Sequence, residues 1–142
     1  MNAEVVHIKG LTFTGKSDTG HWVSMDTTSE IGGNDGGTRP VELVLVAFGG
    51  CTGMDVVSVL KKMQVHYESF EIKLKATISK EHPKVFETID LEYMFKGRDI
   101  DTAKVEKAIT LSQDRYCPVS AMLRHSVEIN WKYEIIGSKD VE

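Results

Sequence analysis

The sequence contains few cysteines, few prolines and no block of like charge. Two cysteines among 142 residues are too few for a disulfide scaffold or a four-ligand zinc site, although Cys51 and Cys117 can form one redox pair. A formal net charge of −4 argues against a broad nucleic-acid-binding surface, so we expect no nucleic-acid partner. With 41% apolar and 27% charged residues, the composition is that of one soluble domain with a substantial core.

The sequence also lacks the signals of export and of membrane insertion. Its start, MNAEVVHIKG, has no basic segment followed by an apolar run, which a secretory signal requires. The longest apolar stretch lies between Glu42 and Asp55, and it is shorter than the roughly 20 residues that a membrane span needs. We therefore expect a cytoplasmic protein without a membrane partner, in which free thiols are the rule.

The stretch from Thr38 to Gln64 predicts a long central helix over residues 40–64. Pro40 suits the first helical position, and Glu42 lies in the first turn, where the helix dipole favours an anion. Residues 41–48 are almost all apolar, which predicts burial on every side. The second half has an apolar stripe of Val56, Val57, Leu60 and Met63 and a polar side with Cys51, Asp55, Ser58 and Lys62. A thiol on the polar side, directly after Gly49 and Gly50, indicates a site that other groups can approach closely.

The segments on either side of this helix predict strands and shorter helices. Residues 4–14 and 20–28 predict two strands around the turn-rich GKSDTG, and the glycine-rich segment 29–39 predicts a flexible loop, either a lid or a surface connector. Alternating segments at 70–79, 87–95 and 127–135 predict an antiparallel sheet with one dry face. Residues 99–114 predict an amphipathic helix capped by Asp99 or Asp101, with an inward face of Val105, Ala108, Ile109 and Ser112.

The order of these elements predicts one α+β domain over residues 1–142. Its parts are an N-terminal hairpin at 1–28, the loop at 29–39, the central helix at 40–64 and a ββααβ half at 70–142. The apolar central helix needs more cover than one small sheet and two modest helices provide. A homodimer whose sheets wrap both central helices would supply that cover.

The two cysteines allow two interpretations. Pro118 suits the first position of a short helix, which makes Cys117 the N-cap, where a thiolate is favoured. Buried free cysteines, however, often behave as small hydrophobes. Asp55, one turn after Cys51, disfavours a thiolate there unless a cation intervenes. The five histidines show no metal-ligand spacing, so we expect no metal site.

Two segments of the sequence resemble the signature segments of the OsmC/Ohr family, the osmotically inducible and organic hydroperoxide resistance proteins. They are RPVELVLVAFGGCTGMDVVSVLKKM and LSQDRYCPVSAML. The RPxEL…GGC pattern is similar to an OsmC-like branch of this family. The resemblance implies an OsmC-like fold, in which antiparallel sheets wrap long central helices in an intertwined homodimer.

The resemblance also implies a thiol chemistry in oxidative stress defence. In that family the central-helix cysteine reduces an organic or hydrogen peroxide and becomes a sulfenic acid, and the second cysteine resolves it as a disulfide. Carried over, Cys51 is the nucleophile and Cys117 the resolving residue. An external dithiol of the lipoyl or thioredoxin type restores the thiols, and no bound cofactor is implied. Phe48 and Met54 flank the thiol, either as core residues or as walls of a pocket for an alkyl peroxide.

The residues that hold the thiolate differ from the family pattern. Family members have a carboxylate directly after the helix-opening proline, whereas here Val41 follows it and the acid is Glu42. The family arginine of the N-terminal region is absent, and Lys16 is the nearest cation there. Arg39, with Glu42, is the expected substitute. Arg115 and Arg124 are weaker options.

Two functions remain open. The first is a cysteine-based hydroperoxide reductase. The second is a non-catalytic dimer that senses redox state or binds a small apolar ligand, which Val41 and Asp55 favour. The sequence alone does not decide whether the protein is an enzyme.

Overall fold

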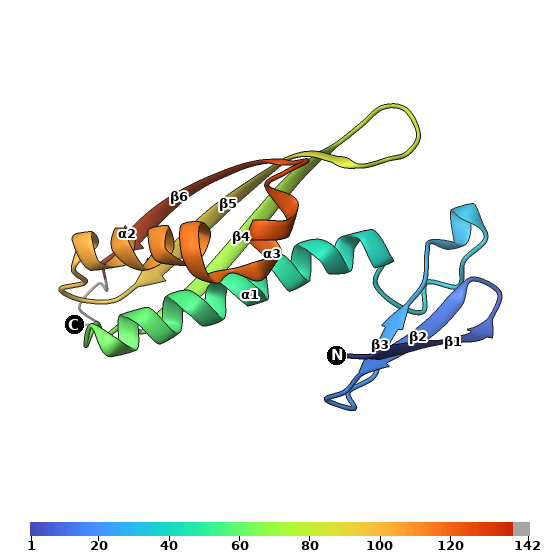
Figure 1. Cartoon of the computed structure of the whole chain (residues 1–142), viewed down its shortest axis with the longest axis horizontal. Helices are drawn as coiled ribbons and strands as arrows, with labels where there is room; N and C mark the ends of the chain where they lie inside the picture. The colour runs from blue at the N-terminus through green and yellow to red at the C-terminus, as the bar shows by residue number, and fades with distance from the viewer. Residues whose placement is uncertain (138–142) are drawn as a thin grey trace, which may run out of the picture. The chain divides into compact units, whose positions relative to one another are not determined.

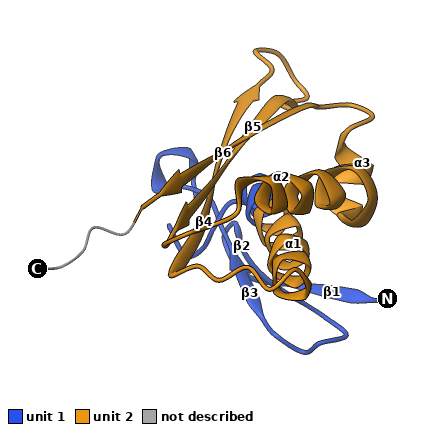
Figure 2. Cartoon of the chain, turned by 90° about the vertical axis from the view of Figure 1, so that its left-hand side faces the viewer, with its two compact units in different colours: residues 1–46 blue, residues 47–142 orange. Residues whose placement is uncertain are grey.

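The computed structural model describes residues 1–137. The chain forms two compact units, Met1–Val46 and Ala47–Glu142 (Figure 2). Helix α1, Pro40–Lys62, begins in the first unit and continues into the second. The predicted ββααβ half runs to residue 142, and its last five residues lie outside the described residues.

The first unit contains a three-stranded antiparallel sheet in the order β1-β2-β3. The strands are β1 (Ala3–Lys9), β2 (Thr12–Ser17) and β3 (Val23–Met25). Two antiparallel strands, β2 and β3, do flank the predicted turn, but the prediction of only two strands is wrong. The chain already turns at Gly10, whose φ of 57° suits glycine, so the first predicted strand is two strands. Part of the predicted turn belongs to β2.

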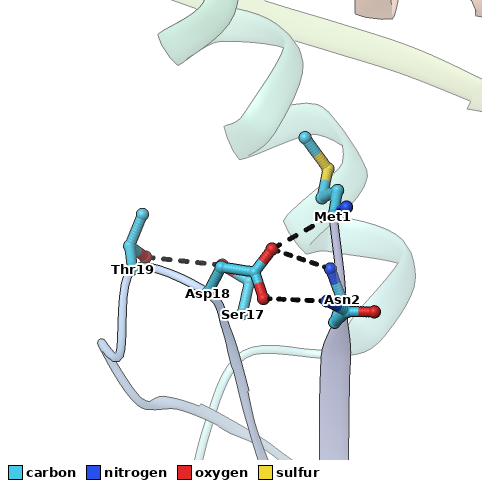
Figure 3. A network of polar contacts seen from close by, with 5 residues as sticks. All are labelled: Met1, Asn2, Ser17, Asp18 and Thr19. Atoms are coloured by element: carbon cyan, nitrogen blue, oxygen red, sulfur yellow. Dashed lines mark hydrogen bonds and ion pairs between the residues drawn. The ribbon is translucent and has the colours of Figure 1, made fainter.

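The carboxylate of Asp18 connects the end of β2 to the start of the chain (Figure 3). It accepts hydrogen bonds from the backbone N–H of Asn2 at 2.9 Å and from its side-chain amide at 3.3 Å. The N-terminal ammonium of Met1 lies 3.9 Å from the same carboxylate. These contacts are exposed, and they close the open end of the β1–β2 hairpin.

The glycine-rich segment is held by one buried carboxylate, that of Asp26, which is 2% exposed. One oxygen of Asp26 accepts from Thr12 Oγ1 at 2.7 Å and from the backbone N–H groups of Asn34 and Gly36 at 3.2 and 3.1 Å. At Gly37, an added Cβ would lie 2.6 Å from the backbone of Ser24. The glycines here allow close packing, and the Asp26 carboxylate satisfies backbone N–H groups of the segment. Its flexibility, as a lid or as a surface connector, stays a prediction.

The second unit contains a three-stranded sheet in the order β4-β5-β6 (Figure 1). Its strands, β4 (Ser69–Ile78), β5 (Phe86–Lys96) and β6 (Glu128–Ile136), confirm the three alternating segments. β4 and β5 are antiparallel, as predicted, but β5 and β6 are parallel. The helices between β5 and β6 return the chain to the starting end of β5, so the last strand enters in the same direction.

Helices cover one face of this sheet (Figure 2). They are the second part of α1, then α2 (Thr102–Leu111) and α3 (Pro118–Leu123), with a π-helical turn η2 (Ser112–Tyr116) between the last two. Asp101, rather than Asp99, caps α2 through its side chain, and Val105, Ala108, Ile109 and Ser112 are buried as predicted. The predicted helix over 99–114 is thus an α-helix that ends at Leu111 and continues as a π turn.

Helix α1 is not buried on every side within this chain. Its buried residues are Phe48, Thr52, Val56, Val59 and Leu60, whereas its exposed apolar residues are Val41, Val44, Val46, Met54 and Val57. By length and composition α1 could also cross a membrane, since its most apolar 18 residues have a mean hydropathy of 2.0, and 28% of them are buried. One copy of the chain therefore does not supply the cover that this apolar helix needs, and its cover by a second copy stays a prediction.

Candidate functional site

The two cysteines meet in the second unit. Cys51 lies on α1 and is half-buried, whereas Cys117 is the N-cap of α3 and is 2% exposed. Both are free thiols. The Cys51 thiol is one of the groups that raise the pKa of Cys117, so the two side chains are neighbours. The N-cap position predicted from Pro118 is confirmed.

The Cys117 thiol does not ionise readily. Burial raises the pKa of Cys117 to about 11, and the neighbouring Cys51 raises it further. The backbone N–H of Ser120, 3.4 Å from the Cys117 sulfur, acts in the opposite direction but does not offset burial. At neutral pH Cys117 therefore keeps its proton and can donate it to the sulfur of Cys51.

Glycine allows α1 to approach β4 closely next to Cys51. A Cβ added at Gly49 would lie 2.8 Å from Leu74, and one added at Gly53 would lie 3.2 Å from Ile72. At Gly50, by contrast, nothing lies within 4 Å. The first glycine of the pair thus serves packing against the sheet, and the second leaves open space directly before the thiol.

A buried chain of hydroxyl groups begins one residue after Cys51. Thr52 Oγ1 lies 2.7 Å from the hydroxyl of Tyr93 and 2.8 Å from Ser112 Oγ. Ser112 Oγ donates to the carboxylate of Asp55 at 3.1 Å. If Tyr93 donates to Thr52 and Thr52 to Ser112, each hydroxyl has one acceptor and the chain ends at Asp55. Asp55 is therefore engaged by Ser112.

The side-chain amide of Gln113 joins this chain to α3. Its nitrogen donates to Thr52 Oγ1 at 3.1 Å and to the Tyr93 hydroxyl at 2.8 Å, and its oxygen accepts from Ser120 Oγ at 2.8 Å. Arg124 donates to the Gln113 carbonyl and, at 3.2 Å, to Ser120 Oγ. Arg124, a weaker candidate for the cation beside the thiolate, thus connects η2 to α3 through these hydrogen bonds.

We call Thr52, Tyr93, Ser112, Gln113 and Ser120 the polar cluster. Each member is at most 4% exposed. Within residues 1–137, every buried side-chain nitrogen and oxygen has a hydrogen-bond partner. Burial raises the pKa of Tyr93 to about 12, although Thr52 and Gln113 act in the opposite direction. The five members of the cluster therefore stay uncharged at neutral pH.

The other two predicted site residues form a pair of their own in the first unit. Glu42 Oε2 accepts the backbone N–H of Arg39 at 3.1 Å, and Glu42 Oε1 lies 3.4 Å from the Arg39 guanidinium. A glutamate at the third helical position that bonds back to the N-cap is half of a capping box. Both side chains are about half exposed. The structure thus brings together Arg39 with Glu42 and, separately, Cys51 with Cys117.

Most of the polar cluster is not predicted by the sequence. The helical pattern places Ser112 on an inward face, but it does not identify Gln113 and Thr52 as its neighbours in the core. A signal was available, because Tyr93 lies on an apolar strand face and a buried tyrosine hydroxyl normally has a partner. Of the two residues that flank the thiol, Phe48 is fully buried and Met54 is 76% exposed. Among residues 1–137, no group of three His, Cys, Asp or Glu side chains is placed to hold a metal ion.

Known proteins match nearly the whole chain. A sequence model of the family described as OsmC-like protein matches residues 32–132. Protein YhfA of Escherichia coli strain K12 is 39% identical over 138 residues, 97% of this chain and 100% of YhfA. A hypothetical protein from Aquifex aeolicus VF5 has a solved structure that matches at a TM-score of 0.84, with 30% identity and 97% of each chain covered.

A more distant structural match carries a functional name. The organic hydroperoxide resistance protein OhrB of Bacillus subtilis matches at a TM-score of 0.66, covering 94% of this chain and 98% of OhrB. At 19% identity this likeness concerns the fold alone. The predicted α+β fold of the OsmC and Ohr proteins is confirmed by these matches.

Proposed function

This chain belongs to the OsmC-like protein family, and we propose that it reduces hydroperoxides through Cys51 and Cys117 as part of oxidative stress defence. The proximity of the two thiols carries the proposal, because a disulfide-forming peroxidase needs a second sulfur within reach of the first. The name of OhrB adds support for a peroxide substrate, although it belongs to a distant relative.

The first step oxidises Cys51. Its thiolate attacks one oxygen of the hydroperoxide, the S–O bond forms, the O–O bond breaks, and the other oxygen leaves as an alcohol after taking up a proton. Cys51 is the attacking thiol because it is half-buried, so a peroxide can reach it. Cys117 is buried, and its pKa of about 11 keeps it protonated at neutral pH. A hydrogen bond from the Cys117 S–H stabilises the Cys51 thiolate.

The second step forms the disulfide. The Cys117 sulfur attacks the Cys51 sulfenic sulfur, the S–S bond forms, and the S–O bond breaks. The departing hydroxide takes the Cys117 proton and leaves as water. This order suits the high pKa of Cys117, because the proton is removed only when its acceptor is generated. An external dithiol then reduces the disulfide and is itself oxidised, so no bound cofactor is needed.

The activating cation is a separate part of the proposal. Arg39, paired with Glu42 at the start of α1, is the candidate. It lies directly before α1 and twelve residues before Cys51, roughly 18 Å along the helix axis, so we expect it to act on Cys51 of the second copy in a dimer. Replacing Arg39 by Met should raise the pH at which Cys51 reacts with iodoacetamide. An unchanged pH profile would leave the Cys117 S–H as the stabilising group.

We further propose a cytoplasmic homodimer in which the second copy covers the apolar side of α1. The exposed residues Val44, Val46 and Met54 support this, because a soluble protein seldom leaves so much apolar helix surface uncovered. Sedimentation in detergent-free buffer should give a dimer. A detergent-dependent monomer would instead favour a membrane location for α1.

A coupled assay tests the enzyme activity directly. We expect consumption of cumene hydroperoxide in the presence of a dithiol, its loss in Cys51→Ser, and a single turnover that ends at the sulfenic acid in Cys117→Ser. Equal rates in all three proteins would remove the peroxidase and leave a non-catalytic redox-sensing or ligand-binding dimer.

A further inference from the structure

The polar cluster has no part in the reaction steps above, yet it occupies the space between the elements that carry the two thiols. Its members come from α1, β5, η2 and α3, and all are buried. Buried polar groups cost free energy unless all of them are hydrogen-bonded, and they are often retained where a unique geometry is required. The geometry at stake here is that of Cys117 relative to Cys51.

We propose that Gln113 is a positioning residue that holds Cys117 against Cys51, so that the pair closes readily into a disulfide. The inference rests on the proposed role of the two thiols. According to this inference, the reduction potential of the disulfide depends on Gln113, whose side-chain hydrogen bonds go to Thr52, Tyr93 and Ser120 and to neither sulfur.

The contacts of Gln113 lead to both thiols. On one side its amide nitrogen donates to Thr52 Oγ1, and Thr52 is the residue after Cys51 on α1. On the other side its amide oxygen accepts from Ser120 Oγ, and the backbone N–H of Ser120 donates to the sulfur of Cys117. One side chain thus connects the helix of the first thiol to the residue that holds the second.

An amide is the group that these contacts require. Gln113 donates two hydrogen bonds and accepts one through its side chain, which neither a carboxylate nor an apolar side chain can do. The π turn η2 contributes as well, because its Ser112 carbonyl accepts the backbone N–H of Cys117 at 2.8 Å. Single π turns inside helices often occur at functional sites.

Disulfide equilibrium with glutathione tests this positioning without any peroxide. Oxidised glutathione converts the two protein thiols to a disulfide and is reduced to two glutathione thiols, so the equilibrium constant measures how well the thiols are placed. The variants are Gln113→Met, which keeps the size, and Ser120→Ala, which removes one hydroxyl and keeps the backbone N–H that donates to the Cys117 sulfur. Ser126→Ala is the control, since its exposed hydroxyl donates to the Leu123 carbonyl, outside the polar cluster.

We expect the equilibrium constant to fall at least tenfold in Gln113→Met and in Ser120→Ala, which corresponds to about 30 mV in reduction potential. The equilibrium constant of the double variant should be close to the lower of the two single-variant values, because both changes break the same link. Ser126→Ala should stay within twofold of the wild type. The free energy of unfolding of each reduced variant is measured as well. A general loss of stability would not by itself lower the equilibrium constant in both cluster variants without adding up in the double variant.

Two results would overturn the inference. One is an equilibrium constant within twofold of the wild type in both cluster variants. The other is a wild-type protein that forms no Cys51–Cys117 disulfide even in the most oxidising glutathione buffer. A wild-type protein that forms the disulfide but consumes no hydroperoxide would contradict the peroxidase proposal. The positioning role of Gln113 would still stand if the equilibrium constants fall as expected.

Discussion

The hydroxyl oxygens of Thr52 and Tyr93 lie 2.7 Å apart in the core of the second unit, although one belongs to α1 and the other to the middle strand β5. Both residues are fully buried. Their contact fixes the register of the helix against the sheet at the position directly after Cys51. The placement of the half-buried thiol therefore depends on a polar contact as well as on apolar packing.

Replacing Tyr93 by Phe should lower the free energy of unfolding by about 1–2 kcal/mol, because it removes one hydroxyl and leaves the Gln113 amide with one acceptor fewer. Denaturant unfolding of the reduced protein measures this loss. Tyr133→Phe is the matched control on β6, since its hydroxyl makes an exposed contact of 3.5 Å to Glu106. Equal losses in the two variants would contradict a special role for the buried hydroxyl.

The stability of the reduced protein should decrease as the pH rises from about 9 to about 11. Burial raises the pKa of Cys117 from 9.0 to about 11, so in this range the folded protein binds a proton that the unfolded chain has released. Alkaline pH therefore favours unfolding. The contribution of the buried Cys117 thiol to the free energy of unfolding is fully present only below pH 9. Denaturant unfolding at a series of pH values measures the slope.

Cys117→Ser provides the comparison for the pH series. Its stability should fall less steeply over the same range, because the serine hydroxyl does not ionise. Tyr93 remains in both proteins, and burial, the main cause that raises its pKa to about 12, is left in place by the substitution. Parallel curves would mean that the Cys117 thiol is not shifted by burial.

The sequence predicted the elements that depend on local patterns. Alternation located β4, β5 and β6, and Pro118 located the start of α3 with Cys117 as its N-cap. The pairing of Cys51 with Cys117 came from the family resemblance, and it stays a prediction. Local propensity sufficed for these features because each depends on a few adjacent residues.

The features that the sequence did not predict depend on distant partners. Gln113 has nothing unusual in its local sequence, and its role appears only when Thr52, Tyr93 and Ser120 are next to it. In the same way, the sequence does not predict these hydrogen bonds of the glycine-rich segment, because their acceptor, Asp26, is outside it. Hydrogen bonds between distant segments leave no periodic pattern in a sequence.

Replacing Asp26 by Asn should loosen the segment from 29 to 37. The amide offers one acceptor oxygen fewer to Thr12, Asn34 and Gly36, so the backbone N–H groups of the last two should exchange with solvent faster. Hydrogen–deuterium exchange measures this effect. Asp18→Asn, at the exposed hairpin end of Figure 3, should leave the exchange of both amides unchanged.

Acid should have the same effect on the wild type. The hydrogen bond from Thr12, together with those from backbone N–H groups, holds the pKa of Asp26 below its usual value, which burial alone would raise. The stabilisation is therefore present above the ordinary carboxyl pKa of 3.8 and is lost as the pH falls through the lower folded-state value. Fast exchange of Gly36 already at pH 5 would contradict this assignment.

The two glycines before Cys51 should respond differently to alanine. At Gly50 nothing lies within 4 Å of an added Cβ, so Gly50→Ala should stabilise the protein by up to about 1 kcal/mol through helix propensity. At Gly49 the added Cβ would lie 2.8 Å from Leu74, and overpacking of this kind costs about 1–3 kcal/mol. Gly49→Ala should therefore unfold at lower denaturant concentration than Gly50→Ala.

A double variant separates overpacking from a change in the helix itself. Leu74→Ala removes the atoms that the new methyl group would strike, so adding Gly49→Ala to it should cost little or nothing. The same addition to the wild type should carry the full penalty. If Gly49→Ala costs as much in the Leu74→Ala background, the close approach of α1 to β4 is not the reason for glycine at this position.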